Sequence, residues 1–393
     1  MNSLNHPPAP GGRRVRRVAL VHSFYRSEVP SGENEIVLAQ ASLLEQAGFE
    51  VLLVGRSSDD HLRGPMSPLK AAWTVGTGRG PDPLAELRAF SPDVVHVHNL
   101  FPNFGDSWLS EWRGPIVLTL HNYRSLCANG LLFREGGACT LCPDGHPLAG
   151  VRHRCYRGSA LATMPFVLRG RSDLRTYPPA QRADRVIALS PRSAATFLRY
   201  GADPDRLSVV PNWVAPVGVP QVAVPGERWI TLGRLDPGKG TARLARSWPR
   251  NLRLDVVGEG PERTLIEQQS HPGIRLLGQQ SRDWISQHLP EYSGLIFASL
   301  SPENSPLSVI EAFSCGVPVV ARAGSAGADQ VEAVDPGWVF HSDHELQSRL
   351  RTVISAGPSA RSAALDEYRR EYSEEVWLDR ITSVYDSAVR AGG

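Results

Sequence analysis

The chain has 393 residues, 41% of them hydrophobic and 21% charged, which is the composition of an ordinary globular protein. At about 100–200 residues per domain, this length predicts two or three domains. The formal net charge of only +2 gives no reason to expect binding to nucleic acid, or strong adsorption to a membrane, through bulk charge.

The N-terminal segment Met1–Arg17 is rich in Pro and Gly and then in Arg, and it lacks the apolar centre of a secretory signal. No run in the chain approaches the roughly 18 apolar residues of a membrane span. We therefore expect a cytoplasmic protein. Because that compartment is reducing, the five cysteines are not expected to form structural disulfides.

The first half of the chain alternates short apolar runs with helical stretches. Val15–His22 is expected to form a strand, Glu33–Ala47 a helix with Ser31 as its N-cap, and Phe49–Val54 the next parallel strand. The further strands expected in this half are Val94–His98, Ile116–Leu120, Arg185–Leu189 and Leu207–Val210. Near-continuous apolar runs are typical of buried parallel strands, which predicts a Rossmann-like domain over residues 14–212.

The second half repeats this organisation after a Pro-rich segment, which we interpret as a linker at 213–228. A second domain is predicted at 229–372, and a last helix in 373–393 is expected to cross back to the first domain. The strands expected here are Trp229–Gly233, Leu252–Gly258, Ile274–Leu277, Gly294–Ala298 and Val317–Ala321. The pattern predicts an α/β protein with two Rossmann-like, doubly wound parallel-sheet domains facing a cleft.

A first motif, G-R-x-x-x-x-K-G, follows the first strand of the second domain and contains Arg234 and Lys239. Ligands of open α/β sheets bind beyond the carboxyl ends of the strands, and two cations beside a helix N-terminus suit a diphosphate. Forty of the 42 basic residues are arginine, and the only lysines are Lys70 and Lys239, which favours a specific role for the latter. The alternative is a solvated turn with two surface cations.

A second motif places Glu303 in a loop and Glu311 inside the helix that follows. Ser305 and Pro306 are expected to be the N-cap and the first residue of this helix. One carboxylate could then reach a sugar hydroxyl and the other a ribose, while free backbone N–H groups face an anion. The alternative is a surface helix with two ordinary glutamates.

A Gly-rich turn at Val257–Glu262 lies between these two motifs. The succession G-R-x-x-x-x-K-G, G-E-G-P-E and E-x₇-E followed by A-x-x-C-G-x-P-V-V resembles the family-4 retaining glycosyltransferases, which have the GT-B fold, over nearly the whole chain. The resemblance implies hexosyl transfer from a UDP- or GDP-sugar to a glycan or lipid-linked acceptor, in polysaccharide or glycoconjugate biosynthesis.

The resemblance also implies roles for individual residues. Arg234 and Lys239 would bind the donor diphosphate in place of a divalent ion, Glu303 would contact the donor sugar, and Glu311 would bind the ribose. The other donor-site residues that it implies are Gly258, Ser305, Leu307 and Ser308. Many family members carry a glycine and an aromatic residue where this chain has Asn304 and Ser305, so the sugar pocket is expected to differ.

Candidate residues in the first domain lie at strand ends. The family closes a Gly-rich loop over the donor phosphates, and Ser31 and Gly32 are the candidates for that role here. His98 and His121 each follow a strand and should lie at the edge of the cleft. A strand-end histidine is most often structural, but the resemblance implies a catalytic place for His121 beside the donor sugar.

Four cysteines lie within a predicted insertion, 127–155: Cys127, Cys139, Cys142 and Cys155. A C-x-x-C core with two flanking cysteines is typical of tetrahedral zinc sites, and a Cys-rich loop occurs in a subset of the resembled family. Four free thiols or a disulfide pair are the alternatives. We expect no cofactor to be required for catalysis.

The segment Val151–Arg185 holds eight arginines against two aspartates and a short apolar stretch at Met164–Leu168. It could contact anionic lipid head groups at the inner face of the membrane or a diphosphate-linked acceptor, and the alternative is a solvated basic face.

Two rival functions stay open from the sequence: a nucleotide-sugar epimerase of similar fold, and a catalytically inactive partner subunit. The presence of Arg234, Lys239, Glu303 and Glu311 argues against the latter.

Overall fold

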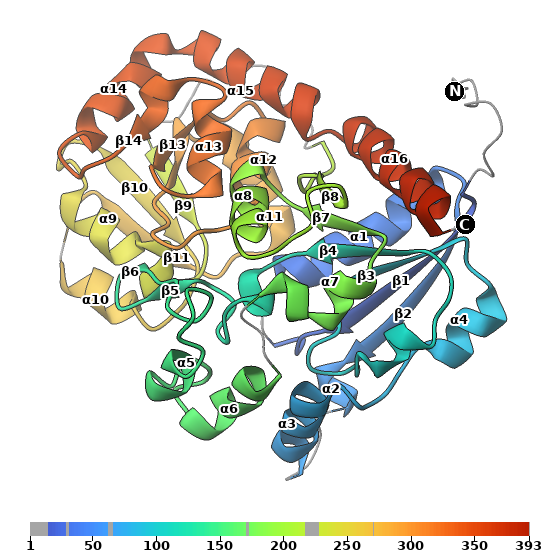
Figure 1. The fold of residues 1–393 in the computed structure, drawn as a ribbon. Helices are drawn as coiled ribbons and strands as arrows, with labels where there is room; N and C mark the ends of the chain where they lie inside the picture. The colour runs from blue at the N-terminus through green and yellow to red at the C-terminus, as the bar shows by residue number, and fades with distance from the viewer. Residues whose placement is uncertain are drawn as a thin grey trace.

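The structure is a computed structural model that describes residues 15–28, 31–61, 66–169, 173–216, 228–269 and 271–392. The chain forms two α/β domains, each built on a six-stranded parallel sheet (Figure 1). This confirms the predicted fold class. Most of the predicted linker, residues 217–227, lies outside the described residues.

The sheet of the first domain has the strand order β2-β1-β3-β4-β7-β8. Its strands are β1 Arg17–Phe24, β2 Glu50–Ser57, β3 Val94–Asn99, β4 Ile116–Leu120, β7 Arg185–Ala188 and β8 Leu207–Val209. The chain progresses outward from β1 to β2 and then returns to β3 on the other side of β1. This reversal of strand order is the place where open α/β sheets bind ligands.

Helices cover both faces of this sheet. The helices of this domain are α1 Gly32–Gln46, α2 Ser58–His61, α3 Ser67–Thr77, α4 Leu84–Phe90, α5 Ala149–Arg152, α6 Ala160–Leu168, α7 Pro178–Arg182 and α8 Pro191–Arg199. Successive residues of a strand point to opposite faces. In β1, Val18 and Leu20 therefore belong to the core under α1, whereas Ala19 and Val21 belong to the core under α4 and α8.

The sheet of the second domain has the strand order β11-β10-β9-β12-β13-β14. Its strands are β9 Arg228–Leu232, β10 Arg253–Val257, β11 Ile274–Gly278, β12 Gly294–Phe297, β13 Val319–Arg322 and β14 Val339–Phe340. Its helices are α9 Thr241–Ser247, α10 Arg263–Gln268, α11 Arg282–His288, α12 Leu307–Ser314, α13 Ala326–Glu332, α14 Leu346–Ala356 and α15 Pro358–Glu371. Here too the strand order reverses, between β9 and β12, which makes the loops after these strands a second candidate ligand site.

The last helix, α16 Glu374–Gly392, leaves the second domain and lies across the first (Figure 1). Trp377, Ile381 and Tyr385 are buried in the core beneath α1. The Tyr385 hydroxyl is 2.8 Å from Nδ1 of the buried His96 in β3. The end of the chain therefore fastens the two domains together.

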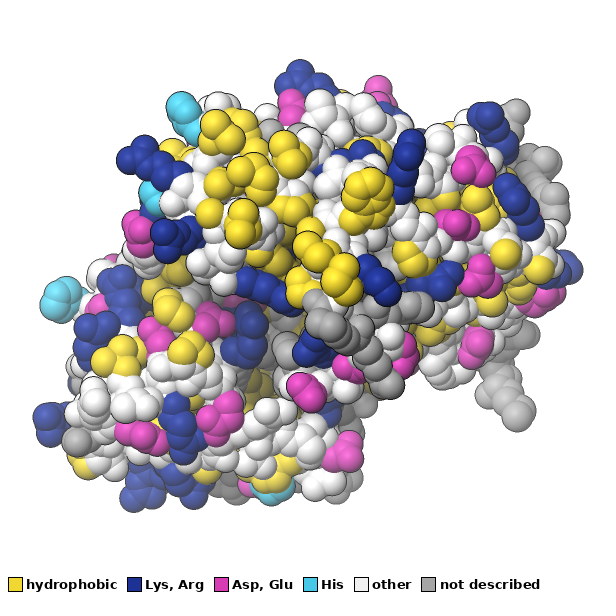
Figure 2. Space-filling model, turned by 90° about the horizontal axis from the view of Figure 1, so that it is seen from below, with side chains coloured by type: hydrophobic (Ala, Val, Ile, Leu, Met, Phe, Trp, Pro, Cys, Tyr) yellow, Lys and Arg dark blue, Asp and Glu magenta, His cyan; other side chains and the backbone are white. Residues whose placement is uncertain are grey.

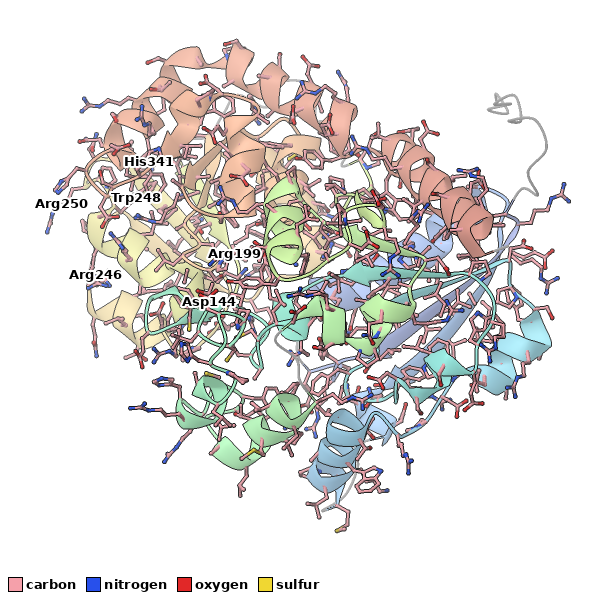
Figure 3. All side chains as sticks on the ribbon, viewed as in Figure 1. Asp144, Arg199, Arg246, Trp248, Arg250 and His341 are labelled. Atoms are coloured by element: carbon pink, nitrogen blue, oxygen red, sulfur yellow. The ribbon has the colours of Figure 1, made fainter. Side chains whose placement is uncertain are left out.

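A small subdomain projects from the first domain. It contains α3, α5, α6 and the hairpin of β5 Phe133–Arg134 with β6 Gly137–Ala138. Val75 of α3 and Phe166 of α6 share a separate small core. The Cys-rich loop is tied to α8 by the Asp144 carboxylate, which lies 3.2 Å from the Arg199 guanidinium (Figure 3). Within the described residues, no helix combines the length and the apolar character that crossing a membrane requires.

Candidate functional site

The first motif forms the loop that follows β9 and touches the loop that follows β10. Gly233 and Gly258 begin these loops with φ angles of 145° and 137°. A Cβ atom placed on Gly258 would lie 1.9 Å from the carbonyl oxygen of Gly233 and 3.7 Å from the backbone nitrogen of Arg234. Only glycine allows this contact, so Gly258 sets the position of the loop that carries Arg234.

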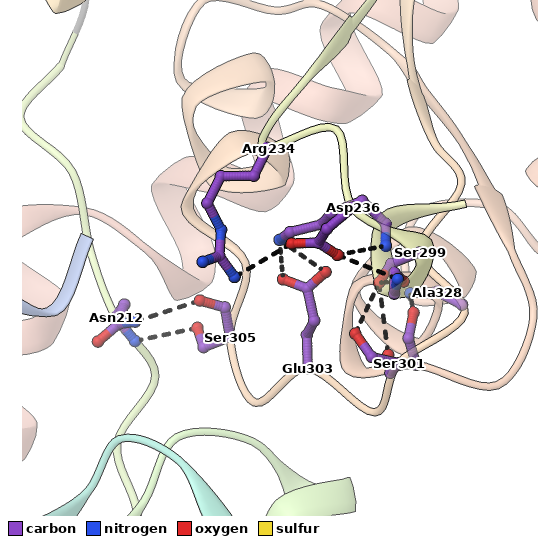
Figure 4. Close-up of polar contacts among 11 residues, drawn as sticks. Asn212, Arg234, Asp236, Ser299, Ser301, Glu303, Ser305 and Ala328 are labelled. Carbon is purple, nitrogen blue, oxygen red and sulfur yellow. Dashed lines mark hydrogen bonds and ion pairs between the residues drawn. The ribbon is translucent and has the colours of Figure 1, made fainter. Parts of the chain in front are cut away.

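Lys239 and Glu303 form an ion pair at the centre of the candidate site. Lys239 ends a 3₁₀ turn, Pro237–Lys239, which Asp236 caps by accepting hydrogen bonds from two backbone N–H groups. The Lys239 ammonium donates to both carboxylate oxygens of Glu303 at 2.9 Å (Figure 4). The two side chains are 28% and 18% exposed. Both can therefore be reached by a ligand and can exchange one partner for another.

Arg234 is the more accessible cation of the motif. Its guanidinium lies 3.2 Å from the Asp236 carboxylate, and 59% of the side chain is exposed. A surface ion pair of this kind is weak, so a more strongly charged ligand can displace it. Asp236 thus holds both cations near one short loop. Its carboxylate pairs with the Arg234 guanidinium and accepts a hydrogen bond from the Lys239 backbone N–H.

The helix of the second motif, α12, begins at Leu307, so the predicted N-cap was wrong by one residue. Pro306 is the N-cap, and it offers no side-chain acceptor to the first turn. Ser305 instead contacts Asn212: its hydroxyl accepts from the Asn212 backbone N–H at 3.3 Å, and its carbonyl accepts from the Asn212 side chain at 3.2 Å (Figure 4). Because no side chain caps the helix, its N-terminal amides are available to an anion.

Glu311 lies one helical turn beyond Leu307 and is held by Arg282 of α11. The Arg282 guanidinium is 3.2 Å from the Glu311 carboxylate and also pairs with Glu35 of α1 in the first domain. Burial raises the pKa of Glu311, and the positive charge of Arg282 opposes that rise. The residue implied to bind the ribose therefore belongs to an ionic bridge between the two domains.

The two domains meet at the start of α12. A Cβ atom on Gly32, the first residue of α1, would lie 3.1 Å from Cδ1 of Leu307, so the candidate phosphate loop of the first domain faces this helix end. The side chain of Asn304 donates to the carbonyl of Leu120 at 3.3 Å. Since His121 follows Leu120 and Asn304 follows Glu303, this contact joins the backbone beside His121 to the loop that carries Glu303.

The two candidate histidines form a pair rather than separate sites. Nδ1 of His98 is 2.8 Å from Nε2 of His121, and Nε2 of His98 is buried without a hydrogen-bond partner. Burial, together with the neighbouring histidines, lowers the pKa of both well below the ordinary value, so both are neutral at pH 7. His96, in contrast, is fully engaged by Thr119 and Tyr385 and is structural.

Glu33, at the start of α1, is a half-buried glutamate with one fully buried carboxylate oxygen. The sequence predicts it only as part of the first turn of a helix and not as a site residue. One of its oxygens accepts from the Asn122 side chain at 3.2 Å, and the other is buried with no partner in hydrogen-bond geometry. Tyr25 and Asn99 lie beside it, and Arg124 acts on it electrostatically. Burial raises the pKa of Glu33 to about 7. The sequence feature that could have indicated this pocket is that Asn99 and Asn122 each directly follow a histidine at the end of a strand.

The four cysteines do come together. All of them line one small cavity in the projecting subdomain. None of the residues implied to bind the nucleotide-sugar lines this cavity. Burial raises the pKa of the Cys142 thiol to about 11, and the neighbouring cysteines add to the rise. However, no three His, Cys, Asp or Glu side chains of the described residues are arranged to hold a metal ion. The arrangement therefore does not support the predicted zinc site beyond the shared cavity.

Comparison with known proteins agrees with this geometry. Residues 30–216 match the model of Glycosyltransferase Family 4, and residues 226–355 match that of Glycosyl transferases group 1. An exopolysaccharide phosphotransferase of Streptomyces coelicolor is 29% identical over an alignment of 173 residues, and the match covers 40% of this chain. The chain spans only 18% of the length of that relative.

Solved structures share the fold. An Anabaena protein, HepE, crystallised with UDP and glucose, is 17% identical with a TM-score of 0.59, and the match covers 94% of this chain and 98% of that one. Sucrose-phosphate synthase of Thermosynechococcus elongatus matches with 15% identity, the same coverage and a TM-score of 0.66. A glycosyltransferase of Rickettsia africae matches with 14% identity, a TM-score of 0.62 and coverage of 96% and 100%. The chain is a family-4 glycosyltransferase of the GT-B fold.

Proposed function

We propose that this protein is a retaining glycosyltransferase that moves a hexosyl group from a UDP- or GDP-sugar to a glycan or lipid-linked acceptor. The observation that carries the proposal is the Lys239–Glu303 pair, in which one ammonium faces both carboxylate oxygens at 2.9 Å. The open N-terminus of α12 begins only four residues after Glu303. A cation, a carboxylate and free amides at one place suit a sugar joined to a diphosphate.

In this proposal the ion pair changes partners when the donor binds. Lys239 and the exposed Arg234 turn to the diphosphate, and the amides of Leu307 and Ser308 meet its oxygens. Glu303 is then released to accept hydrogen bonds from the sugar hydroxyls. The two cations stabilise the negative charge that grows on the leaving phosphate, so transfer needs no divalent ion.

Retention follows if the acceptor hydroxyl enters on the face that the diphosphate leaves. The departing phosphate can then take the proton of that hydroxyl, so no separate carboxylate nucleophile is needed. The neutral His98–His121 pair lies on the first-domain side, where an imidazole can donate to a sugar hydroxyl without adding a charge. Closure of the two domains would exclude water and limit hydrolysis.

We assign the polar pocket around Glu33 to the acceptor. Glu33, Asn99 and Asn122 offer both donors and acceptors of hydrogen bonds, as the recognition of a hydroxyl-rich ligand requires. The Anabaena structure holds UDP and glucose, and the Streptomyces relative is named for an exopolysaccharide. The first supports a uridine donor, and the second supports a role in polysaccharide synthesis.

A thermal shift with nucleotides tests the donor site. A ligand at about 100 times its Kd stabilises a protein by roughly 2.7 kcal/mol, which raises the melting temperature by a few degrees. UDP or GDP is expected to stabilise the wild-type protein and to lose most of that effect with Lys239→Ala. If no nucleotide stabilises the wild type, the site does not bind a nucleotide-sugar, and an inactive partner subunit becomes the better interpretation. Conversion of the donor sugar in the absence of any acceptor would instead identify an epimerase.

A further inference from the structure

The surface of the projecting subdomain is unusually apolar. Of the 14 large hydrophobic side chains that are exposed in the described residues, nine belong to residues 66–73 and 131–168. These nine are Met66, Leu69, Trp73, Leu131, Leu141, Leu148, Leu161, Met164 and Leu168. We call this set the apolar face. Leu161 is 86% exposed, Leu168 74% and Trp73 61%. Apolar surface concentrated in this way marks a site of interaction.

The apolar face is built by helices whose inner sides are already packed. Val75 of α3 and Phe166 of α6 fill the small core of the subdomain, and a Cβ atom on Gly76 would lie 3.6 Å from Pro165. Leu69 and Trp73 are four residues apart on α3, so they share one side of that helix. The exposed residues of α6 are also spaced by three and four. The helices therefore bury one apolar side and present a second one to solvent.

Positive charge predominates around this face. The segments 66–81 and 145–169 contain no Asp or Glu, although the whole chain is almost neutral. Their cations are Lys70, Arg79, Arg152, Arg154, Arg157 and Arg169. All of these except Arg169, which pairs with Asp106, are exposed. Figure 2 views the molecule from the side of α3, α5 and α6 and shows hydrophobic side chains gathered together with Lys and Arg around them.

We propose that the apolar face docks on an anionic lipid membrane. Leucine, methionine and tryptophan side chains would enter the boundary between head groups and acyl chains, while the surrounding cations meet the anionic head groups. The charge favours a membrane: the segments 66–81 and 145–169, which carry α3, α5 and α6, have only positive charges, although Glu135 and Asp144 lie in the loop between Leu131 and Leu148. A predominantly basic apolar surface complements a negatively charged surface and repels a second copy of itself. The helices lie in the membrane surface and do not span it.

The docked face lies next to the pocket assigned to the acceptor. The Arg124 guanidinium, which acts on Glu33, lies 4.6 Å from the ring centre of Phe101 and 5.8 Å from that of Phe166 in α6. One side chain thus contacts the core of the docking subdomain and faces the Glu33 pocket. Given the proposed function, a lipid-linked acceptor would enter the site directly from the membrane. The docking itself does not depend on that function.

Vesicle sedimentation with the full chain tests the docking. We expect the protein to sediment with vesicles of phosphatidylglycerol and phosphatidylcholine and to stay in solution with phosphatidylcholine alone. Leu161→Glu combined with Trp73→Glu should weaken binding at least tenfold. Leu265→Glu combined with Ile354→Glu is the matched control, because both residues are exposed leucine or isoleucine in the second domain. This control should bind like the wild type.

The charge is tested in the same assay. Arg152→Glu combined with Arg154→Glu should also reduce binding at least tenfold, whereas Arg351→Glu on α14 should not. Melting curves with and without UDP show whether each variant is folded and keeps its donor site, so a failed donor site is distinguished from failed docking. Absence of wild-type binding to anionic vesicles, or equal binding by the variants and their controls, overturns the proposal. So does a wild-type dimer that Leu161→Glu converts to a monomer.

Discussion

The second domain carries most of its proposed donor residues on two continuous stretches, 232–240 and 303–311, whereas the first domain gathers its proposed acceptor pocket from distant parts of the chain. That pocket combines Tyr25, Glu33, Asn99, Asn122 and Arg124. Phosphate recognition needs only backbone amides, glycine and a few cations on adjacent loops, so its residues keep a fixed spacing. Recognition of an acceptor needs side chains from several strand ends, and only the folded sheet brings those together.

The largest expected effect in the second domain is that of Glu303→Ala. We expect turnover to fall by about a hundredfold to a thousandfold, because the variant loses a polar group that orients the reacting sugar. UDP affinity should be kept or increased, since Lys239 no longer has Glu303 as a competitor for the phosphate. Initial rates and calorimetric titration with UDP measure the two quantities.

Glu267→Gln is the control, because Glu267 forms an exposed ion pair with Arg263 on α10. Turnover of Glu303→Ala that equals that of the control would remove Glu303 from the reaction. A large loss of UDP affinity in Glu303→Ala would show that the carboxylate holds Lys239 in place for the nucleotide and does not compete with it.

Lys239→Ala is expected to have the next largest effect, and on binding. A hydrogen bond to a charged group contributes about 1.5–3 kcal/mol, so the Kd for UDP should rise roughly tenfold to a hundredfold. Lys70→Ala is a matched control, since Lys70 is the other lysine in the chain and lies exposed on α3. Equal affinities of the two variants for UDP would contradict a phosphate role for Lys239.

The four cysteines of the first domain allow a test of metal binding, because the sequence and the structure lead to different expectations. The C-x-x-C spacing alone predicts about one zinc per chain, held by four thiolates, whereas the described residues show no three side chains arranged for a metal ion. Metal analysis of the wild-type chain tests that prediction from the sequence. Cys139→Ser combined with Cys142→Ser should release the zinc, and Cys315→Ser, a buried cysteine of the second domain, should not. Four thiols that react freely in a metal-free wild-type chain would show that the loop folds without zinc.

The sequence predicted the sheets more completely than the site. Ile116–Leu120 was expected as a strand and is β4 residue for residue, because a buried parallel strand must be an uninterrupted apolar run. The start of α12 was misplaced because Ser305 is a good capping residue in isolation, yet its hydroxyl and carbonyl bind Asn212, which is 93 residues away. Such distant partners leave no local pattern. The burial of Glu33 was invisible for the same reason.

Glu33 gives the smallest predicted effect, and it concerns stability. Burial raises the pKa of Glu33 to about 7 from an ordinary value of 4.5. Below pH 4.5 the carboxyl is protonated in the folded and the unfolded chain. As the pH rises toward and through 7, the unfolded chain ionises freely while the folded chain must ionise a buried group, so this residue's contribution to stability is lost. Glu33→Gln should therefore melt like the wild type near pH 4.5 and a few degrees higher at pH 8.

The same variant separates a structural from an acceptor role. Glu45→Gln on the exposed side of α1 is the control and should show no pH-dependent difference. If Glu33 recognises the acceptor, Glu33→Gln should raise the KM for the acceptor and leave the Kd for UDP unchanged, because the pocket lies on the first-domain side. A stability difference that is the same at both pH values would show that the carboxylate ionises without hindrance and that the pocket is open to water. An unchanged KM would mean that Glu33 only shapes the start of α1 and takes no part in recognition of the acceptor.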